Sequence, residues 1–465
     1  MKRLLLPALL LTTLTACMAA PADTLPAAAP TPTPASTPAP TAAPAPADAL
    51  TPEEKIGQLF IIRPDALDLT LPQETINDAK ADGVTMLTDA MRETLQAYPV
   101  GGICQFGKNI TDPEQLAQFN ADLQAASRTP LFIAVDEEGG AVARLANHPA
   151  FDLPQYESAA AVGASGDPVD ACAMGQTIGA YLKEYGFNMD FAPDADVNTN
   201  PDNPIIGTRA FSSDAATAAE MAAAAADGLR TSGILPTLKH FPGHGDTAED
   251  SHTALAVTYK TLDELQACEL LPFAADTGLH AVMVGHIAAP NVTGDGTPAT
   301  LSPQLVALIP DAENTLIVTD SLAMDAITAA YTPGEAAVQA LQAGCDVLLM
   351  PNSLPEAYAA VLEAVQNGTI SEERLDRSVN KILLYKQQFA SQGGQPSGCR
   401  QPRRNKRGTL CPTPSGPLTA RFLPSAFRAS SAIPSSCSPR WTASSRRALS
   451  KLSPRRALKR RTIPI

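Results

Sequence analysis

Residues 233–246 read GILPTLKHFPGHGD, an apolar run that passes directly into a polar, glycine- and proline-rich loop. The run is short and apolar, as expected of a buried β-strand, and we predict a strand over residues 234–239. The glycines and prolines that follow favour a bent loop. The same pattern, an apolar run followed directly by polar residues such as Lys239 and His240, recurs in the rest of the chain.

Seven further apolar runs predict strands. Together we expect strands at residues 57–62, 101–105, 131–135, 187–192, 234–239, 281–286, 316–320 and 347–350. Helix-like segments at 114–126, 170–185 and 215–230 separate some of them, and the alanine-rich start of the last is a strong helix former. This order predicts an α/β fold, a (β/α)8 TIM-like barrel with a single catalytic domain. We expect residues 65–98 to be the least regular, coil-like part.

Polar side chains follow several of the predicted strands. Asp136, Lys239 with His240, His286 and Asp320 each come directly after an apolar run. Any one of them could be a helix N-cap or a surface charge. Because the carboxyl ends of the strands of a parallel barrel share one mouth, we expect these residues to form a site there.

Residues 237–252 concentrate groups suited to proton transfer or polar-ligand binding. They hold three of the six histidines, Lys239 and three carboxylates. The histidines are His240, His244 and His252, and the carboxylates are Asp246, Glu249 and Asp250. A zinc site is the obvious alternative. The spacing argues against it, since the histidines lie on a bent loop rather than on one helix face and no cysteine is near. We therefore expect no metal and no cofactor.

The order KHFPGHG followed by DSH resembles the signature of glycoside hydrolase family 3 enzymes of the β-N-acetylglucosaminidase, or β-hexosaminidase, type. Four further segments occur in the family's order: VDEEGGAVAR at 135–144, NMDFAPDADVN at 188–198, NPIIGTRAF at 203–211 and VTDSLAM at 318–324. The resemblance covers about residues 50 to 390. It implies the same barrel, and the release of terminal N-acetylglucosamine from glycans.

The resemblance also implies residue roles. Asp320 corresponds to the nucleophile, which forms a glycosyl-Asp intermediate, and His252 paired with Asp250 corresponds to the acid/base. A histidine with a pKa near ~6.5 can give a proton to the glycosidic oxygen and later take one from water. The implied substrate-binding residues are Asp136, Arg144, Arg209, Lys239 and His240. A pocket for one terminal sugar implies exo action.

Two departures from the family's pattern stand out. The family usually shows DQEGGRVxR where residues 136–144 read DEEGGAVAR, so an arginine is lost at Ala141 and a carboxylate is gained at Glu137. The change could alter the sugar preference or the state of Glu138. We also expect no second globular domain after residue 390, which argues against the β-glucosidase members, whose acid/base resembles a Glu in that domain.

The first fifty residues predict export and anchoring. Residues 1–17 begin with Lys2 and Arg3, continue through an apolar stretch and end in LTAC, which resembles a bacterial lipobox with Cys17 as the lipidated residue. An ordinary secretory signal with an incidental cysteine is the alternative. Residues 18–50 are rich in Ala, Pro and Thr and suit a disordered tether. We expect an extracytoplasmic protein, anchored to the bacterial cell membrane by lipid.

Charge separates the expected barrel domain, residues 51–390, from the C-terminal tail. The chain has a net charge of −14, yet residues 391–465 hold 16 of its 34 Lys and Arg and none of its 48 Asp and Glu. Such a basic Ser-, Arg- and Pro-rich tail can bind nucleic acid or anionic polymers. We favour a disordered extension or a shifted-frame translation, and we assign it neither a nucleic-acid partner nor a catalytic role.

The cysteines predict free thiols in the barrel domain. Of the eight, Cys17 and three in the tail stand apart, and the other four are scattered singly. We expect those four, Cys104, Cys172, Cys268 and Cys345, to be buried free thiols rather than a disulfide framework.

The expected function is therefore that of an exo-acting, retaining β-N-acetylglucosaminidase, a monomer acting on cell-wall or other glycans. Two alternatives stay open. A His acid/base repels phosphate less than a carboxylate does, so the same site could support a glycoside phosphorylase. A non-catalytic, lipid-anchored sugar-binding protein would share the anchor and the tether, but it has no need for a nucleophile together with a His/Asp dyad.

Overall fold

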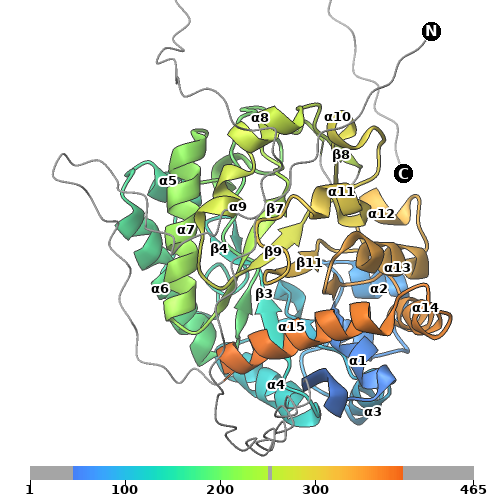
Figure 1. Cartoon of the computed structure of the whole chain (residues 1–465). Coiled ribbons are helices and arrows are strands. Elements are labelled where there is room, and N and C mark those ends of the chain that lie inside the picture. The colour runs from blue at the N-terminus through green and yellow to red at the C-terminus, as the bar shows by residue number, and fades with distance from the viewer. Residues whose placement is uncertain (1–45, 250–253, 391–465) are drawn as a thin grey trace, which may run out of the picture. The chain divides into compact units, whose positions relative to one another are not determined.

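The computed structural model describes residues 46–249 and 254–390 (Figure 1). The predicted lipidation site Cys17, the predicted dyad Asp250 and His252, residues 18–45 of the predicted tether and the basic tail lie outside these residues. Residues 46–50 of the predicted tether are described, and the 3-10 helix η1 (Pro46–Ala49) forms there with Ala47 buried. Within the described residues, every helix is too short or too polar to cross a bilayer.

Eight parallel strands form the barrel. They are β1 (Phe60–Ile62), β2 (Gly102–Cys104), β3 (Phe132–Val135), β6 (Met189–Asp190), β7 (Leu235–Phe241), β9 (Ala281–Val284), β11 (Leu316–Thr319) and β12 (Leu348–Leu349). The strands neighbour one another in chain order, and β1 pairs with β12 in the register Phe60↔Leu348. A parallel bridge between Val318 and Val347 links β11 to the start of β12 and so closes the ring.

Helices surround this sheet (Figure 1). They are α1 (Pro52–Gln58), α2 (Gln73–Asn77), α3 (Asp89–Ala97), α4 (Pro113–Ala126), α5 (Ala159–Gly163), α6 (Pro168–Glu184), α7 (Ala215–Thr231), α8 (Leu262–Ala267), α9 (Leu271–Ala275), α10 (Pro290–Thr293), α11 (Pro303–Val306), α12 (Asp325–Thr328), α13 (Pro333–Ala343), α14 (Leu354–Gln366) and α15 (Glu372–Ala390). Short 3-10 helices η1 (Pro46–Ala49), η2 (Pro64–Leu67), η3 (Gly107–Asn109), η4 (Gly207–Arg209) and η5 (Ala299–Leu301) also occur. Two small sheets pair β4 (Glu137–Gly139) with β5 (Val142–Ala143) and β8 (Ala256–Val257) with β10 (Ile287–Ala288).

Small residues set the close packing of α6 on α7. A Cβ atom at Gly175 would lie 2.2 Å from the carbonyl oxygen of Ala225, and one at Gly228 would lie 2.2 Å from that of Cys172. The alanines of α7 therefore do more than favour a helix, because they and these glycines let the two helix backbones approach one another.

The predicted barrel is confirmed, and each predicted strand overlaps an observed one. Two boundary predictions are wrong. Residues 57 and 58 end helix α1, which begins at a capping box on Thr51. Residues 65–98 are not all coil, since α3 forms there with Thr88 as its N-cap and with Met91, Thr94 and Leu95 buried. That helix depends on a cap and on three inward-facing side chains, a weaker signal than the apolar strands.

The cysteine prediction needs one correction. Cys104, Cys268 and Cys345 are free thiols, as expected, although Cys268 is only partly buried. Cys172 is disulfide-bonded. The spacing of singly scattered cysteines does not predict this bond.

Both ends of the described segment lie on the side of the barrel where the strands begin. Helix α15 packs against α1 through an ion pair of 2.6 Å between Lys55 and Asp376, and the backbone N–H of Ala47 donates to Asn380 Oδ1 at 3.0 Å. The buried Lys386 of α15 donates to Gln58 Oε1 at 2.6 Å, at the end of α1 that leads into β1. Both ends thus lie on the face opposite the mouth formed by the strands' carboxyl ends.

Candidate active site

The predicted polar residues are at the carboxyl ends of alternate strands of the barrel. Asp136 follows β3, Lys239 and His240 lie in the last part of β7, and Asp320 follows β11. A parallel bridge between Asp194 and Lys239 extends the pairing of β6 with β7 into this region. The structure therefore brings these residues to one mouth of the barrel.

Lys239 lies between two carboxylates. Its Nζ is 2.8 Å from Asp136 Oδ1 and 2.6 Å from Glu138 Oε1, and its side chain is 3% exposed. Burial raises the pKa of Asp136, but the charges of Lys239 and Arg144 outweigh burial and hold that pKa below its usual range. Burial likewise lowers the pKa of Lys239, and the two carboxylates more than reverse this effect. All three groups are therefore charged at neutral pH.

Arg209, at the end of η4, binds the second of these carboxylates with two hydrogen bonds. Its Nε and Nη2 donate to Glu138 Oε2 and Oε1 at 2.9 and 2.8 Å. Burial would raise the pKa of Glu138, but Arg209 and Lys239 hold it well below the usual range of a glutamate. Glu138 was not among the predicted site residues, although its place two positions after Asp136 was a signal that could have found it. It joins two of the predicted cations.

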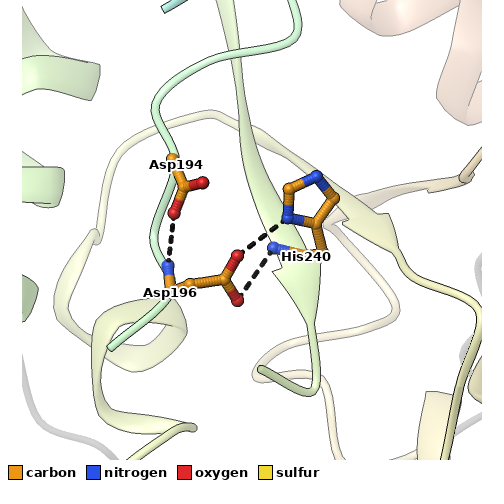
Figure 2. Close-up of side chains that lie close together, drawn as sticks. All are labelled: Asp194, Asp196 and His240. Carbon is orange, nitrogen blue, oxygen red and sulfur yellow. Dashed lines mark hydrogen bonds and ion pairs between the residues drawn. The ribbon is translucent and has the colours of Figure 1, made fainter. Parts of the chain in front are cut away.

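His240 extends the network from Arg209 to Asp196, and Figure 2 shows its ring beside the Asp196 carboxylate. Its Nε2 is 3.4 Å from Arg209 Nη2, and its Nδ1 is 2.8 Å from Asp196 Oδ2. Asp196 Oδ1 also accepts the backbone N–H of His244 at 2.6 Å. Burial lowers the pKa of His240, but the Asp196 carboxylate outweighs burial and raises it overall. Asp196 therefore orients the His240 ring and fixes the start of the loop that follows β7.

Asp194, Asp196 and His240 are the kind of set that could hold a metal ion, since their ligand atoms lie within 4.8 Å of one another (Figure 2). Most of these atoms already have partners. One Asp196 oxygen pairs with the His240 ring and the other accepts the backbone N–H of His244, and Asp194 Oδ1 accepts the backbone N–H of Asp196 at 2.9 Å. Asp194 Oδ2 has no hydrogen bond within the described residues, and it lies 3.6 Å from the guanidinium of Arg209. That guanidinium supplies the positive charge which a metal would bring, so the residues fit a hydrogen-bonded network better than a metal site.

Arg144 lies at the edge of this network, next to two residues that the sequence did not single out. Its Nη2 is 3.6 Å from Asp136 Oδ2, and its guanidinium lies 5.7 Å from the centre of the Phe106 ring. Arg63 lies over the same ring at 4.5 Å. Arg63 directly follows β1 and Phe106 comes two residues after β2, so the rule that polar and aromatic residues at strand ends line the mouth could have found both.

Glu137 does not join the network, although it stands between Asp136 and Glu138 in the chain. Its side chain is fully buried and binds the backbone of Arg144, Leu145 and Ala146. The expectation that this extra carboxylate changes the state of Glu138 is not supported, because the charges that shift the pKa of Glu138 most are those of Lys239 and Arg209.

Asp320 is partly exposed, and its Oδ1 accepts the backbone N–H of Ser321 at 2.7 Å. Burial and the neighbouring His240 lower the pKa of His244, while Asp196 and Asp320 act in the opposite direction, so Asp320 shares the electrostatic environment of the loop after β7. His286 follows β9 by two residues, as expected, and its side chain is fully buried there, with Nε2 2.8 Å from the Ser321 carbonyl oxygen. It supports the segment that carries Asp320.

A cavity of about 320 Å³ opens beside the same loop. Asp246, Glu249, Tyr259 and Lys260 are among the residues that line it, and Tyr259 is 72% exposed. Glu249 directly precedes Asp250 in the chain. The cavity is therefore lined by the residue that immediately precedes, in sequence, the predicted acid/base dyad.

Comparisons with known proteins cover most of the barrel domain. The model of the glycosyl hydrolase family 3 N-terminal domain matches residues 51–384. The β-hexosaminidase LpqI of Mycobacterium tuberculosis is 32% identical over 366 residues, which cover 72% of this chain and 83% of that protein. The β-hexosaminidase A of Pseudoalteromonas piscicida is 32% identical over 335 residues, 65% of this chain, and the match spans only 56% of that longer protein. A solved family 3 β-N-acetylglucosaminidase from a Paenibacillus species is similar with a TM-score of 0.66 and 36% identity, covering 78% of this chain and 66% of that one.

Proposed function

Because the chain belongs to glycosyl hydrolase family 3, we propose that it is an exo-acting, retaining β-N-acetylglucosaminidase that releases terminal N-acetylglucosamine from glycans. The similar proteins named β-hexosaminidase support the hydrolysis of N-acetyl-hexosaminides. The observation that carries the proposal is the network of alternating charges at the mouth, Asp136–Lys239–Glu138–Arg209, with Asp320 two strands from β7 along the barrel.

We assign the covalent step to Asp320. Its carboxylate attacks C1 of the sugar, a bond forms between C1 and the carboxylate oxygen, and the bond from C1 to the leaving oxygen breaks. His252 gives its proton to that oxygen. A water then attacks C1 from the other side while His252 takes its proton, which regenerates the Asp320 carboxylate and retains the anomeric configuration. Asp250, through the other ring nitrogen, would orient His252 and favour its charged form.

The network residues would hold the terminal sugar. Asp136, Arg144, Arg209, Lys239 and His240 offer charged donors and acceptors to sugar hydroxyls, and hydrogen bonds to charged groups contribute about 1.5–3 kcal/mol each. Since Asp136, Lys239 and Arg209 are already held by ion pairs with one another or with Glu138, little rotamer freedom of these three remains to be lost when the sugar binds. The exposed Tyr259 ring beside Glu249 suits the leaving-group sugar, because an aromatic face can cover the apolar face of a pyranose.

The proposed location follows from the sequence. Lipidation at Cys17 and the Ala-, Pro- and Thr-rich segment would hold the enzyme on the outer side of the bacterial cell membrane, and wall fragments would be its natural substrates. Palmitate incorporation by the wild type and by Cys17→Ser tests this part. Equal labelling of the two proteins would overturn it.

The activity is tested by release of 4-nitrophenol from its N-acetyl-β-D-glucosaminide by the full-length protein, with the β-glucoside in parallel. We expect turnover of the glucosaminide, loss in Asp320→Ala, a severe decrease in His252→Ala and no change in the exposed control Asp263→Ala. Proton NMR during turnover should show the β anomer first, as retention requires.

Other outcomes separate the alternatives. Turnover that requires phosphate and yields a sugar phosphate would favour the phosphorylase. A folded protein that binds N-acetylglucosamine but turns over neither glycoside would favour the sugar-binding protein. Either result overturns the proposed hydrolysis.

A further inference from the structure

Glu137 lies in β4 with a fully buried side chain, between the two carboxylates that hold Lys239. Its Oε2 accepts the backbone N–H of Arg144 at 2.5 Å and that of Leu145 at 2.9 Å. Its Oε1 accepts the backbone N–H of Ala146 and the Tyr181 hydroxyl, both at 2.9 Å. One buried carboxylate thus gathers the three consecutive N–H groups that follow β5.

This arrangement requires an acceptor at both oxygens. An ionised carboxylate offers only lone pairs, whereas an amide or a protonated carboxyl carries a donor of its own. An amide nitrogen at the Oε2 position would face two backbone N–H groups. At the Oε1 position it would face the N–H of Ala146, although Tyr181 could turn its hydroxyl to accept. A buried donor left facing a donor costs about 1–3 kcal/mol.

The first of the three N–H groups belongs to Arg144. The guanidinium of Arg144 is held loosely by comparison, since its Nη2 is 3.6 Å from Asp136 and its buried Nε has no hydrogen-bond partner in the described part of the chain. The direction of this side chain is therefore set mainly by where its backbone lies. The backbone in turn is bound to the Glu137 carboxylate.

We propose that Glu137 is a positioning residue for substrate binding, whose carboxylate fixes the turn after β5 so that Arg144 points at the terminal sugar. The inference rests on the proposed function, in which Arg144 binds that sugar. Glu137 itself touches neither the sugar nor the reacting atoms.

Steady-state kinetics on 4-nitrophenyl N-acetyl-β-D-glucosaminide test the proposal with Glu137→Gln, Arg144→Ala and the double variant. We expect Glu137→Gln to raise KM about tenfold, equivalent to about 1.4 kcal/mol, with kcat changed less than about threefold. In the Arg144→Ala background the same substitution should raise KM less than about twofold, because the residue through which it acts is gone. If Glu137 had only a structural role, Glu137→Gln would raise KM by the same factor in the wild-type and in the Arg144→Ala protein.

Tyr181→Phe is the second variant, and it keeps the proposal testable if Glu137→Gln does not fold. It removes one of the four donors and keeps the carboxylate, so KM should rise less than in Glu137→Gln and should depend in the same way on Arg144. An equal KM effect with and without Arg144, an unchanged KM, or a loss confined to kcat would overturn the inference.

Calorimetric binding of N-acetylglucosamine separates this inference from the proposed function. If the wild type binds the sugar without turning over the glycoside, the proposed hydrolysis fails while the ratios of Kd still test the link between Glu137 and Arg144. If the wild type neither binds nor turns over, both fail.

Discussion

Replacing Glu138 by glutamine removes the negative charge that lies between Lys239 and Arg209 and keeps the shape of the side chain. Glu138 is 2% exposed, Lys239 3% and Arg209 15%, so water can replace little of what is lost. Glu138 accepts three charge-assisted hydrogen bonds, from Arg209 Nε and Nη2 and from Lys239 Nζ. The amide oxygen of glutamine can accept some of these bonds, but they are weaker because the acceptor is uncharged.

The structure sets the expected magnitude. Breaking a buried ion pair by neutralising one partner costs about 3–5 kcal/mol, because the other charges stay buried without compensation. We expect Glu138→Gln to lower the free energy of unfolding by this amount, a large share of the about 5–15 kcal/mol typical of a folded domain. Because Asp136 still neutralises Lys239, the variant should fold.

The assay is urea unfolding of the full-length protein at pH 7, followed by far-UV circular dichroism, with the midpoints compared at equal slopes. The matched control is Glu373→Gln, whose partner Arg377 is 3.5 Å away and whose side chain is 86% exposed. Such surface pairs contribute about 0–1 kcal/mol, so the control should unfold close to the wild type.

The pH dependence gives a second readout. The pKa of Glu138 is held below its unfolded value of about 4.3, so its ionisation contributes stability that is fully present above that pH and is lost as the pH falls toward the native pKa. The gap between wild type and Glu138→Gln should be constant from pH 8 to about pH 5 and should narrow below pH 4. A cost below about 1 kcal/mol at pH 7, as in the control, would refute the reasoning.

Three further predictions concern other parts of the molecule. Burial lowers the pKa of Lys386 to about 7, so the free energy of unfolding should fall as the pH falls from about 10 to 7 and stay level below. In thermal melts this slope should disappear in Lys386→Met and remain in the control Lys80→Met, and an unchanged slope in Lys386→Met contradicts the assignment. Burial and the Asp196 charge raise the pKa of Asp194 to about 7, so its contribution to the free energy of unfolding is present at low pH and lost as the pH rises from about 4 through 7. In thermal melts over this pH range, Asp194→Asn should show a smaller loss of stability than the wild type, and an equal or larger loss would count against the assignment. A Cβ at Gly245 would lie 2.0 Å from the Val197 carbonyl oxygen, so Gly245→Ala should displace the loop after β7. In steady-state kinetics on the glucosaminide, this variant should lower kcat at least tenfold. The control Gly296→Ala, whose added Cβ meets no atom within 4 Å, should leave kcat within about twofold of the wild type.

The barrel could be predicted because its signal is local. Each strand is a short run of buried apolar residues, and the polar residues that matter come directly after such a run, as Asp136 and Asp320 do. A parallel barrel then brings these strand ends to one mouth without further information.

The connections between those residues could not be predicted in the same way. His240 binds Asp196 across 44 residues of chain, and Glu138 binds Arg209 across 71. Such contacts depend on how loops from different strands pack, and no residue spacing encodes them. The same reason explains why Glu137 was expected to change the pocket, although its side chain binds the backbone of the turn after β5.

The packing of α15 against α1 has a practical consequence for handling the enzyme. Ala47 and Asn380 are in hydrogen-bond contact on the face where the strands begin, while Asp136, Lys239 and Asp320 lie at the strands' other ends. Attaching the protein to a bead or a cell surface through residue 46 or residue 390 would turn the mouth of the barrel outward, toward the medium. Polymeric substrates could then reach it as freely as small glycosides, and a linker added at one end should not change the ratio of the two rates.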